Sequence, residues 1–575
     1  MVNTKIDADR LLGLLRTLTT SLETHEAVGI SAEMSDGLKQ TVTAIMAEAD
    51  SWPVEVKAHT AHITNARNQI AEMLLQIGKW KDHEGPSIEA TQARRDLTKA
   101  IRSFSSRIVA LLSGAADALV EKKPLIYLAP IPKDLLEVLA ATGVDKWDRV
   151  YVLGCFDYRK TVFTQQSRAF ILAKALLLSN IISAGSRVAI IGGGIGGVTA
   201  AAALMINGTH VTIYEKSHRL LVLQESNHSR YIHPSLYEWP RAGSIDNNAN
   251  LPMLRWKAGV ASDVSRQILR EFRRLYRAFP SLLTTKLVHE VTKIVPIEPA
   301  AHARQYKIVA NDSPLEGPFD AVILAIGFGI ENNSRHGISM PSYWENDTPH
   351  SIGRFSKLRP GRLLVSGAGD GGLIDVLRTA LIDFNHVDIL NIIPGLDSDD
   401  VVNSLIEIEE LSEKHYTSSP NVAFDFGSLY SAKIGEWANR FSWKRSFERR
   451  RAHDQVVTFN YRRPQMFLRD SSIINRILVQ ILLSIGIVSP ILGSIDSSVI
   501  MPVDEDRRRR YTVKWSQNSP ADTFDRVIIR HGVNGSWFEE SFPDLAPGCI
   551  SMRGRLANLR LHETIRQEHF DFFVK

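Results

Sequence analysis

The sequence has very little cysteine: Cys155 and Cys549 are the only two in 575 residues. Two cysteines this far apart form neither a Cys-x-x-Cys redox pair nor a metal-binding pattern. Disulfide reductase chemistry through such a pair is therefore excluded, and we expect no metal site. Because disulfide frameworks belong to oxidising compartments, their absence is typical of the reducing cytoplasm, where we expect this protein.

The sequence also lacks an uninterrupted apolar segment long enough to cross a membrane. The charge-free runs 188–209 and 477–495 are broken by glycines, and the second also contains Pro490. No apolar stretch follows the N-terminal methionine, so a signal peptide is not expected. The net charge of +5 is small for this length, and the basic clusters are typical of solvated surface. We expect no nucleic-acid or membrane partner. These clusters are Arg445–Arg451 with Arg462 and Arg463, and Arg507–Arg510.

Residues 1–123 have few strand signals. Leucine, isoleucine and methionine recur there at helical spacing, which predicts an all-α helical hairpin or bundle. This part contains no catalytic constellation. It could pack against the rest of the chain, form a homo-oligomer, contact a protein partner or help to recognise a substrate.

The strongest functional pattern lies between residues 186 and 216. An apolar run enters a Gly-x-Gly-x-x-Gly turn, an Ala-rich helical run follows, and a second strand ends at Glu215. This order predicts a dinucleotide-binding βαβ unit. Missing side chains in the turn let a pyrophosphate approach the helix N-terminus, and the carboxylate can hold a ribose. The candidate cofactor-binding residues are Gly192, Gly193, Gly194, Ile195, Gly196, Gly197, Glu215 and Lys216.

A long polar segment, 218–259, follows Glu215. Loops of this length inside compact domains are uncommon unless they are functional. Its His233, Tyr237 and Trp239 are candidates for a catalytic or ring-binding pocket, although the aromatic residues could instead form the core of a structural lid. We expect the strand 286–297 to pass an adenine near Val291.

The strand 319–327 ends in the small residues Ala325 and Gly327, which would let a cofactor come close. Its pattern returns near the C-terminus at 524–532, where Arg530 and His531 replace the small residues. Those two could meet a phosphate, a flavin carbonyl or a substrate carboxylate, or they could form a salt-bridged strand end.

A second glycine turn, within 363–378, contains Gly367, Gly369, Asp370 and Gly372. It could bind a nicotinamide cofactor, it could supply an Asp370 carboxylate to the ribitol of FAD, or it could be purely structural. The next strand is expected at 387–393 and has no terminal acid, which still permits NADPH because arginine accommodates its 2′-phosphate.

These motifs resemble the FAD/NAD(P)-binding oxidoreductases of the two-dinucleotide-binding-domain type, and more closely a set of bacterial FAD-dependent oxidoreductases. The resemblance covers roughly residues 145 to 535. It rests on Gln165–Ala169, the first glycine turn with Glu215, and the segments 230–240 and 365–375. The chain departs from the family at 219–221, where Arg-Leu-Leu replaces an Arg-x-Gly-Gly element.

The resemblance implies an α/β fold with Rossmann-like FAD/NAD(P)-binding domains. We expect a helical domain at 1–123, an FAD-binding domain at 124–335, a second dinucleotide or substrate domain at 336–545 that returns to the FAD sheet, and a C-terminal tail at 546–575. Bound FAD would exchange hydride with NAD(P)H or with a small organic substrate. The alternative is a non-catalytic FAD- or NAD-binding sensor or scaffold.

Overall fold

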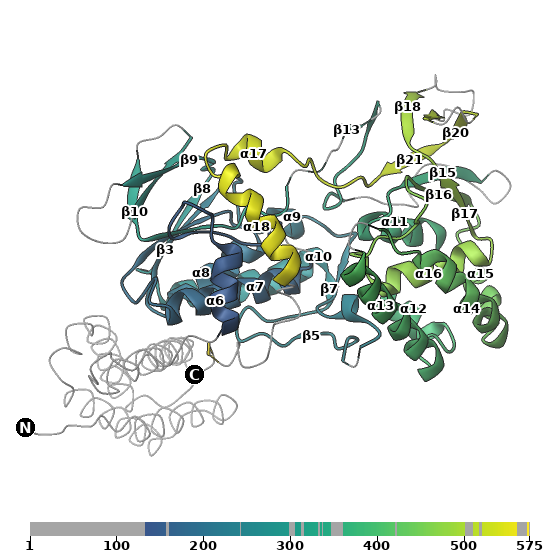
Figure 1. The fold of residues 1–575 in the computed structure, drawn as a ribbon, viewed down its shortest axis with the longest axis horizontal. Coiled ribbons are helices and arrows are strands. Elements are labelled where there is room, and N and C mark those ends of the chain that lie inside the picture. Colours follow the sequence, from purple (N-terminus) through teal and green to yellow (C-terminus); the bar gives the residue numbers. More distant parts are fainter. Residues whose placement is uncertain are drawn as a thin grey trace, which may run out of the picture.

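The structure is a computed structural model, and the part described is residues 133–156, 160–241, 243–297, 305–311, 315–329, 331, 334–335, 337–346, 360–419, 422–500, 510–516, 520–559 and 572–573. The helical domain expected at 1–123 lies outside these residues. Figure 1 shows the described chain as two α/β units, the first in blue and teal and the second in green, with yellow C-terminal helices over the first.

The first unit is built on a parallel sheet with the strand order β1-β12-β2-β3-β8. Successive residues of a strand point to opposite faces of a sheet. Val188 and Ile190 accordingly pack with the helices, and Ala189 and Ile191 pack with the antiparallel strands. The strands are β1 (Val150–Val152), β2 (Arg187–Ile191), β3 (His210–Glu215), β8 (Leu283–Leu287) and β12 (Ala321–Leu324). Helices α7 (Val162–Leu178), α8 (Ile195–Met205) and α10 (Ala261–Ala278) cover one face, and β9 (Val291–Ile297), β10 (Gln305–Ala310) and β11 (Glu316–Phe319) the other.

Between β3 and α10 the chain makes an excursion of short elements. Two of its buried side chains, Leu236 and Trp239, belong to the hydrophobic core of the second unit. The excursion therefore joins the two units through shared core packing. It contains α9 (Val222–Glu225), β4 (Tyr231–Ile232), the 3₁₀ helix η2 (Leu236–Glu238), β5 (Asn248–Ala249), β6 (Trp256–Lys257) and β7 (Gly259–Val260).

The second unit repeats the design of the first, with a parallel sheet in the order β17-β16-β15-β21. Its strands are β15 (Gly361–Ser366), β16 (Gln455–Tyr461), β17 (Val488–Leu492) and β21 (Arg526–Ile529). Helices α11 (Asp370–Ala380), α12 (His386–Ile392), α13 (Asp399–Ser418), α14 (Phe426–Arg440), α15 (Trp443–Glu448) and α16 (Ile473–Ser484) contribute to one core cluster. The antiparallel strands β18 (Ile495–Ile500), β19 (Tyr511–Trp515) and β20 (Asp522–Phe524) and the short β14 (Ile338–Ser339), which pairs with β13 (Ser334–Arg335), lie at the opposite face.

Equivalent hydrogen bonds show that the two units match in detail. The carboxylate of Asp320 accepts from the backbone N–H of Arg187 at 2.8 Å, and Asp525 accepts from that of Arg362 at 2.8 Å. The return of the 319–327 pattern at 524–532 therefore marks the last strand of a second Rossmann-like unit. The predicted α/β fold with Rossmann-like sheets is confirmed.

Several expected elements are placed differently. The strand expected at 286–297 is two strands, β8 and β9, in different sheets. The strand expected at 387–393 is helix α12, because Asn385 caps its N-terminus with side-chain hydrogen bonds. The true partner of β15 is β16, which follows only after α12 to α15.

The expected return of residues 336–545 to the first sheet is also wrong, because β21 pairs with β15 in the second sheet. The chain instead returns as helices. Helices α17 (Trp537–Ser541) and α18 (Ala546–Leu559) pack with α6 (Lys133–Thr142) and the first sheet, so the residues to 559 are not a free tail (Figure 1). In the described residues no helix is both long and apolar enough to cross a membrane.

Candidate functional site

The first glycine turn connects β2 to α8 and is shaped by close backbone contacts. Gly192 has a φ of +107°, and a Cβ there would collide with the carbonyl oxygen of Ala325. A Cβ on Gly197 would collide with the carbonyl of Gly192. Gly194, the N-cap residue of α8, has no atom within 4 Å of an added Cβ and makes no side-chain capping hydrogen bond. The turn is closed on the protein side and open at the helix N-terminus, which is the anion-binding end.

Glu215 lies at the end of β3 beside this turn and is buried. Its Oε2 accepts from the N–H of Gly193 at 2.6 Å, and its Oε1 accepts from the N–H of Ser217 at 2.7 Å. An ionised carboxylate has about four lone-pair sites, so two remain for ribose hydroxyl groups. Where the family has Arg-x-Gly-Gly, Leu220 packs over Gly193 and the N–H of Leu221 donates to its carbonyl at 3.0 Å.

The other first-unit candidates lie in different surroundings. Lys216 is exposed directly after β3, and Ile195 is buried at the start of α8. Gly196 borders the side chain of Leu153. Val291 is buried in β9, where it pairs with β10, and Ala325 is buried at the end of β12. Gly327 has a φ of +78° with open space at its Cβ position.

The second glycine turn has the same construction. A Cβ on Gly367 would collide with the carbonyl of Arg530, and one on Gly372 with that of Gly367. Gly369 is open, as Gly194 is. Asp370, the first residue of α11, accepts from the N–H of Ser472 at 2.9 Å and from Nδ2 of Asn475 at 2.7 Å. Burial raises the pKa of Asp370, against the effect of these donors, and the bonds tie its carboxylate to the start of α16.

A cavity of about 780 Å³ lies between the two units, within the size range of small-molecule sites. The first unit contributes Phe156, Lys160–Val162 and residues of the excursion, and the second contributes its glycine turn and the carboxyl ends of β16 and β21. Ligands of parallel α/β sheets bind at that edge. Among the described lining residues are Tyr231, His233, Tyr237, Phe328, Tyr343, Gly367, Gly369, Asp370, Gly372, Arg462, Arg463, Arg530 and His531, but no residue of 192–197.

The structure brings three of the four catalytic candidates together at this cavity. His233, Tyr237 and His531 line it, whereas Trp239 lies in the hydrophobic core of the second unit. Burial lowers the pKa of His233, and its Nδ1 accepts from the N–H of Leu236 at 3.0 Å. Trp239 therefore anchors the excursion to the second unit, as its place in the hydrophobic core of that unit shows. The described residues hold no cluster of His, Cys, Asp or Glu suited to a metal ion.

Polar side chains meet at the carboxyl edge of the second sheet. Ser366 ends β15 and donates to Oδ1 of Asn460 in β16 at 2.5 Å. Nδ2 of Asn460 donates to the carbonyls of Ile491 and Gly493, which fixes the orientation of the amide. The Ser366 hydroxyl therefore accepts from Nε2 of His531, 2.7 Å away. This bond holds His531 at the junction of β15 and β21.

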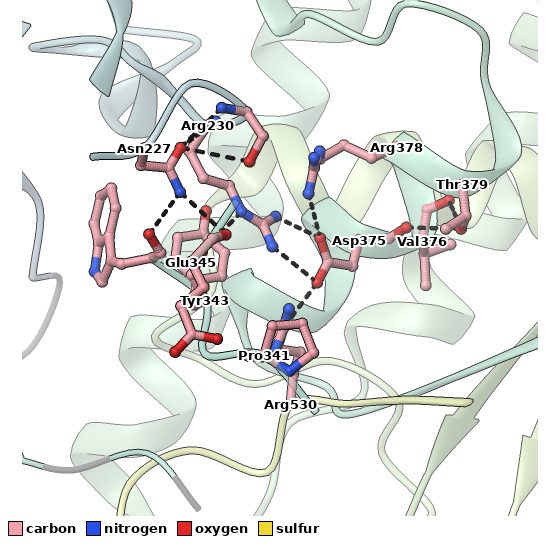
Figure 2. A network of polar contacts seen from close by, with 12 residues as sticks. Asn227, Arg230, Pro341, Tyr343, Glu345, Asp375, Val376, Arg378, Thr379 and Arg530 are labelled. Carbon is pink, nitrogen blue, oxygen red and sulfur yellow. Dashed lines mark hydrogen bonds and ion pairs between the residues drawn. The ribbon is translucent and has the colours of Figure 1, made fainter. Parts of the chain in front are cut away.

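A buried ionic network joins the excursion to the second unit (Figure 2). Asp375 in α11 is paired with Arg230 of the excursion, with Arg530 at 2.8 Å and with Arg378 at 3.0 Å. Burial alone would raise the pKa of Asp375, but the three guanidinium groups outweigh it and hold this pKa well below its usual range. The same network reaches Tyr343, whose carbonyl accepts from Nε of Arg230 at 2.9 Å.

Sequence reasoning missed residues whose role depends on the true position of β16. Tyr461 holds the position at the end of β16 that Glu215 holds at the end of β3. The N–H of Gly367 donates to the carbonyl of Asn460, just before Tyr461, as the N–H of Gly192 donates to the carbonyl of Tyr214, just before Glu215. Arg462 and Arg463 follow, exposed, and line the cavity, although their sequence context indicated solvated surface. The feature of the sequence that could have indicated this place is the pair of arginines directly after an apolar strand.

The comparisons agree with the geometry of the first unit. The family model of an NAD(P)-binding Rossmann-like domain matches residues 190–231, which include the first glycine turn and Glu215. This supports the resemblance to FAD/NAD(P)-binding oxidoreductases in the dinucleotide-binding segment. No curated protein matches the chain.

The chain is also similar, at low levels, to solved structures of thioredoxin reductases and a bacillithiol disulfide reductase. Thioredoxin reductase of Lactococcus lactis is 14% identical over 60% of this chain and 77% of that one, with a TM-score of 0.29. Bacillithiol disulfide reductase Bdr of Staphylococcus aureus is 12% identical over 63% and 80%, with a TM-score of 0.31. Thioredoxin reductase of T. acidophilum is 11% identical over 66% and 98%, with a TM-score of 0.30.

Proposed function

We propose that this protein is an FAD-dependent oxidoreductase in which FAD binds the first unit and a nicotinamide nucleotide binds the second. One observation carries the proposal: Gly194 and Gly369 are the N-cap residues of α8 and α11 and have open space at the Cβ position, in two units of one design. The second turn lines the cavity between the units. Nucleotides held by neighbouring units can bring their reactive ends together, which hydride transfer requires.

The first unit fits FAD by its donors and acceptors. The first turn of α8 offers N–H groups and a positive dipole end to the pyrophosphate, and Glu215 retains lone pairs for the adenosine ribose. When bound, FAD supplies the hydride chemistry, and the protein binds and orients it. The buried surroundings of Glu215 exclude water from the ribose contact.

The end of β16 favours NADPH over NADH as the second nucleotide. A carboxylate at this position would hold the 2′-hydroxyl of NADH, but Tyr461 stands in its place. Arg462 and Arg463 lie next to it at the cavity and can bind a 2′-phosphate through charge-assisted hydrogen bonds.

Replacing Arg462 and Arg463 together with alanine is expected to weaken NADPH binding by about 10- to 100-fold, because hydrogen bonds to a phosphate are lost. NADH affinity should change by less than about twofold, since NADH has no 2′-phosphate. Calorimetric titration of both nucleotides measures this. Arg440→Ala is the matched control, because Arg440 pairs with Asp400 on the surface of the same unit. Equal loss for both nucleotides would contradict the assignment.

The visible spectrum of the purified full-length chain, with mass identification of any released nucleotide, tests the function itself. We expect a flavin spectrum that bleaches when NADPH is added without oxygen. Bound flavin that no reductant bleaches would favour the sensor or scaffold. Colourless protein that binds only a nicotinamide nucleotide would end the FAD assignment.

A further inference from the structure

A second pocket lies in the second unit, apart from the cavity between the units. Its volume is about 620 Å³, within the size range of small-molecule sites. Among the residues that the structure describes, it shares no lining residue with the cavity. We call it the α14 pocket. Its wall includes Asp425, Gly427 and Ser431 around the start of α14, Pro464 and Met466 from the segment that follows β16, and Gln480 of α16.

Gln480 brings an unused hydrogen-bond acceptor to this pocket. The residue is only 6% exposed, and its Nε2 donates to Oγ of Ser431 at 2.9 Å, so that Oε1 lies on the other side of the amide. Oε1 has no hydrogen-bond partner in the described part of the chain. Buried polar atoms are nearly always paired, because an unpaired one costs stability. Oε1 therefore lacks a donor that a ligand in the pocket would supply.

Asp425 directs a carboxylate to the same place. Its Oδ1 is 3.5 Å from the position that a Cβ on Gly427 would occupy, and Oε1 of Gln480 is 3.7 Å from that position. The two oxygens therefore lie on the same side of Gly427, which has no side chain to separate them. One group of a ligand can reach both of them.

The charges and acceptors of the α14 pocket suit a cation. A helix N-terminus usually attracts an anion, but Asp425 already fills that place as the N-cap of α14. Its carboxylate accepts from the N–H of Ser428 at 3.2 Å and from the Ser428 hydroxyl at 2.6 Å. Asp425 is also the only charged side chain among the described lining residues. An incoming anion would meet a carboxylate and an amide oxygen, which only accept hydrogen bonds.

We propose that the α14 pocket binds an organic molecule through a primary ammonium group. An ammonium has three N–H donors and no acceptor, so it can donate to Oε1 of Gln480 and to the Asp425 carboxylate together. Pro464 and Met466 offer apolar surface to the hydrocarbon stem that carries it. A metal ion fits less well, because the described residues hold no cluster of His, Cys, Asp or Glu suited to one. The binding requires neither flavin nor nicotinamide nucleotide, so it is independent of the proposed function.

Calorimetric titration of the full-length protein with butylammonium chloride tests this site. Gln480→Met keeps the length of the side chain but removes Oε1, so binding should weaken by about 10- to 100-fold, the effect of losing a hydrogen bond to a charged group. Asp425→Asn keeps a capping oxygen and removes the charge, so binding should weaken by about 2- to 5-fold, since Asp425 is exposed. Asp400→Asn is the control. It removes an exposed carboxylate of the same unit outside the pocket and should leave the affinity unchanged.

Two further probes check the charge of the ligand. 1-Butanol has the same stem without the charge and should bind more weakly than butylammonium, and acetate should not bind. Binding of acetate in place of butylammonium would overturn the inference, because the Gln480 amide would then offer its nitrogen to the pocket. Unchanged butylammonium affinity in Gln480→Met, or no binding by the unaltered protein, would overturn it as well.

A free amine and the side chain of a lysine present the same ammonium group. Titration with a lysine whose backbone amine and carboxyl are blocked distinguishes these two sources. Tighter binding of butylammonium than of the blocked lysine is the expected result and assigns the pocket to a small amine. Tighter binding of the blocked lysine would keep the ammonium site and assign it to a lysine side chain.

Discussion

Replacing Gly194 with valine is expected to lower the affinity for FAD by more than about 100-fold while the protein remains folded. The space beyond Gly194 is open in the protein, so a valine side chain meets no protein atom there. It would instead occupy the approach of the pyrophosphate to the start of α8. Losing even two charge-assisted hydrogen bonds, each worth about 1.5–3 kcal/mol, gives an effect of this size. Flavin content and titration of the apoprotein with FAD measure it.

Gly369→Val is the corresponding change in the second unit, and it should abolish nicotinamide-nucleotide binding without loss of flavin. Gly435→Val is the control, because Gly435 is equally open but lies on the exposed side of α14. Circular dichroism should show all three variants folded. Full FAD occupancy in Gly194→Val would show that the first turn is not the pyrophosphate site.

Asp375→Ala is expected to reduce the free energy of unfolding by about 3–5 kcal/mol, because it leaves buried guanidinium groups without their shared carboxylate. Arg230 and Arg530 are 2% and 7% exposed, so water cannot replace Asp375. Urea denaturation followed by tryptophan fluorescence reports the loss. Asp400→Ala, which breaks a half-exposed pair with Arg440, should cost less than about 1 kcal/mol.

The pH dependence of this effect has a definite sign. The pKa of Asp375 is lower in the folded than in the unfolded protein, so its contribution is fully present above the unfolded value and is lost as the pH falls through the folded one. The difference between the unaltered protein and Asp375→Ala should therefore be constant at neutral pH and shrink only below about pH 4. If this difference in unfolding free energy shrank near pH 6 instead, the stabilisation would belong to a titratable group other than Asp375.

The sequence predicts the first unit well because its signals are local. A strand, three glycines, a helix and a terminal acid occur within about thirty residues, which is the length of one βαβ unit. The second unit is split: α12 to α15 separate its glycine turn from β16, so the next apolar run after α11 was assigned to a strand.

The candidate site was harder to predict because distant segments form it. Glycine spacing identified Gly367, Gly369 and Gly372, and the strand-end pattern identified His531, since both are local patterns. The pairing of Arg230 with Asp375 joins residues 145 positions apart, and no local pattern indicates it. Trp239 looked functional because aromatic residues serve both pockets and cores, and only the packing around it distinguishes the two.

The shared packing of Leu236 and Trp239 also sets an order of events during synthesis. These side chains leave the ribosome more than a hundred residues before helix α16, which packs against η2, so the nascent first half exposes this apolar cluster until the second half is complete. The first half therefore completes its folding only after the second half is made, and cleavage of the chain between the two units would leave the side chains of Leu236 and Trp239 exposed to water.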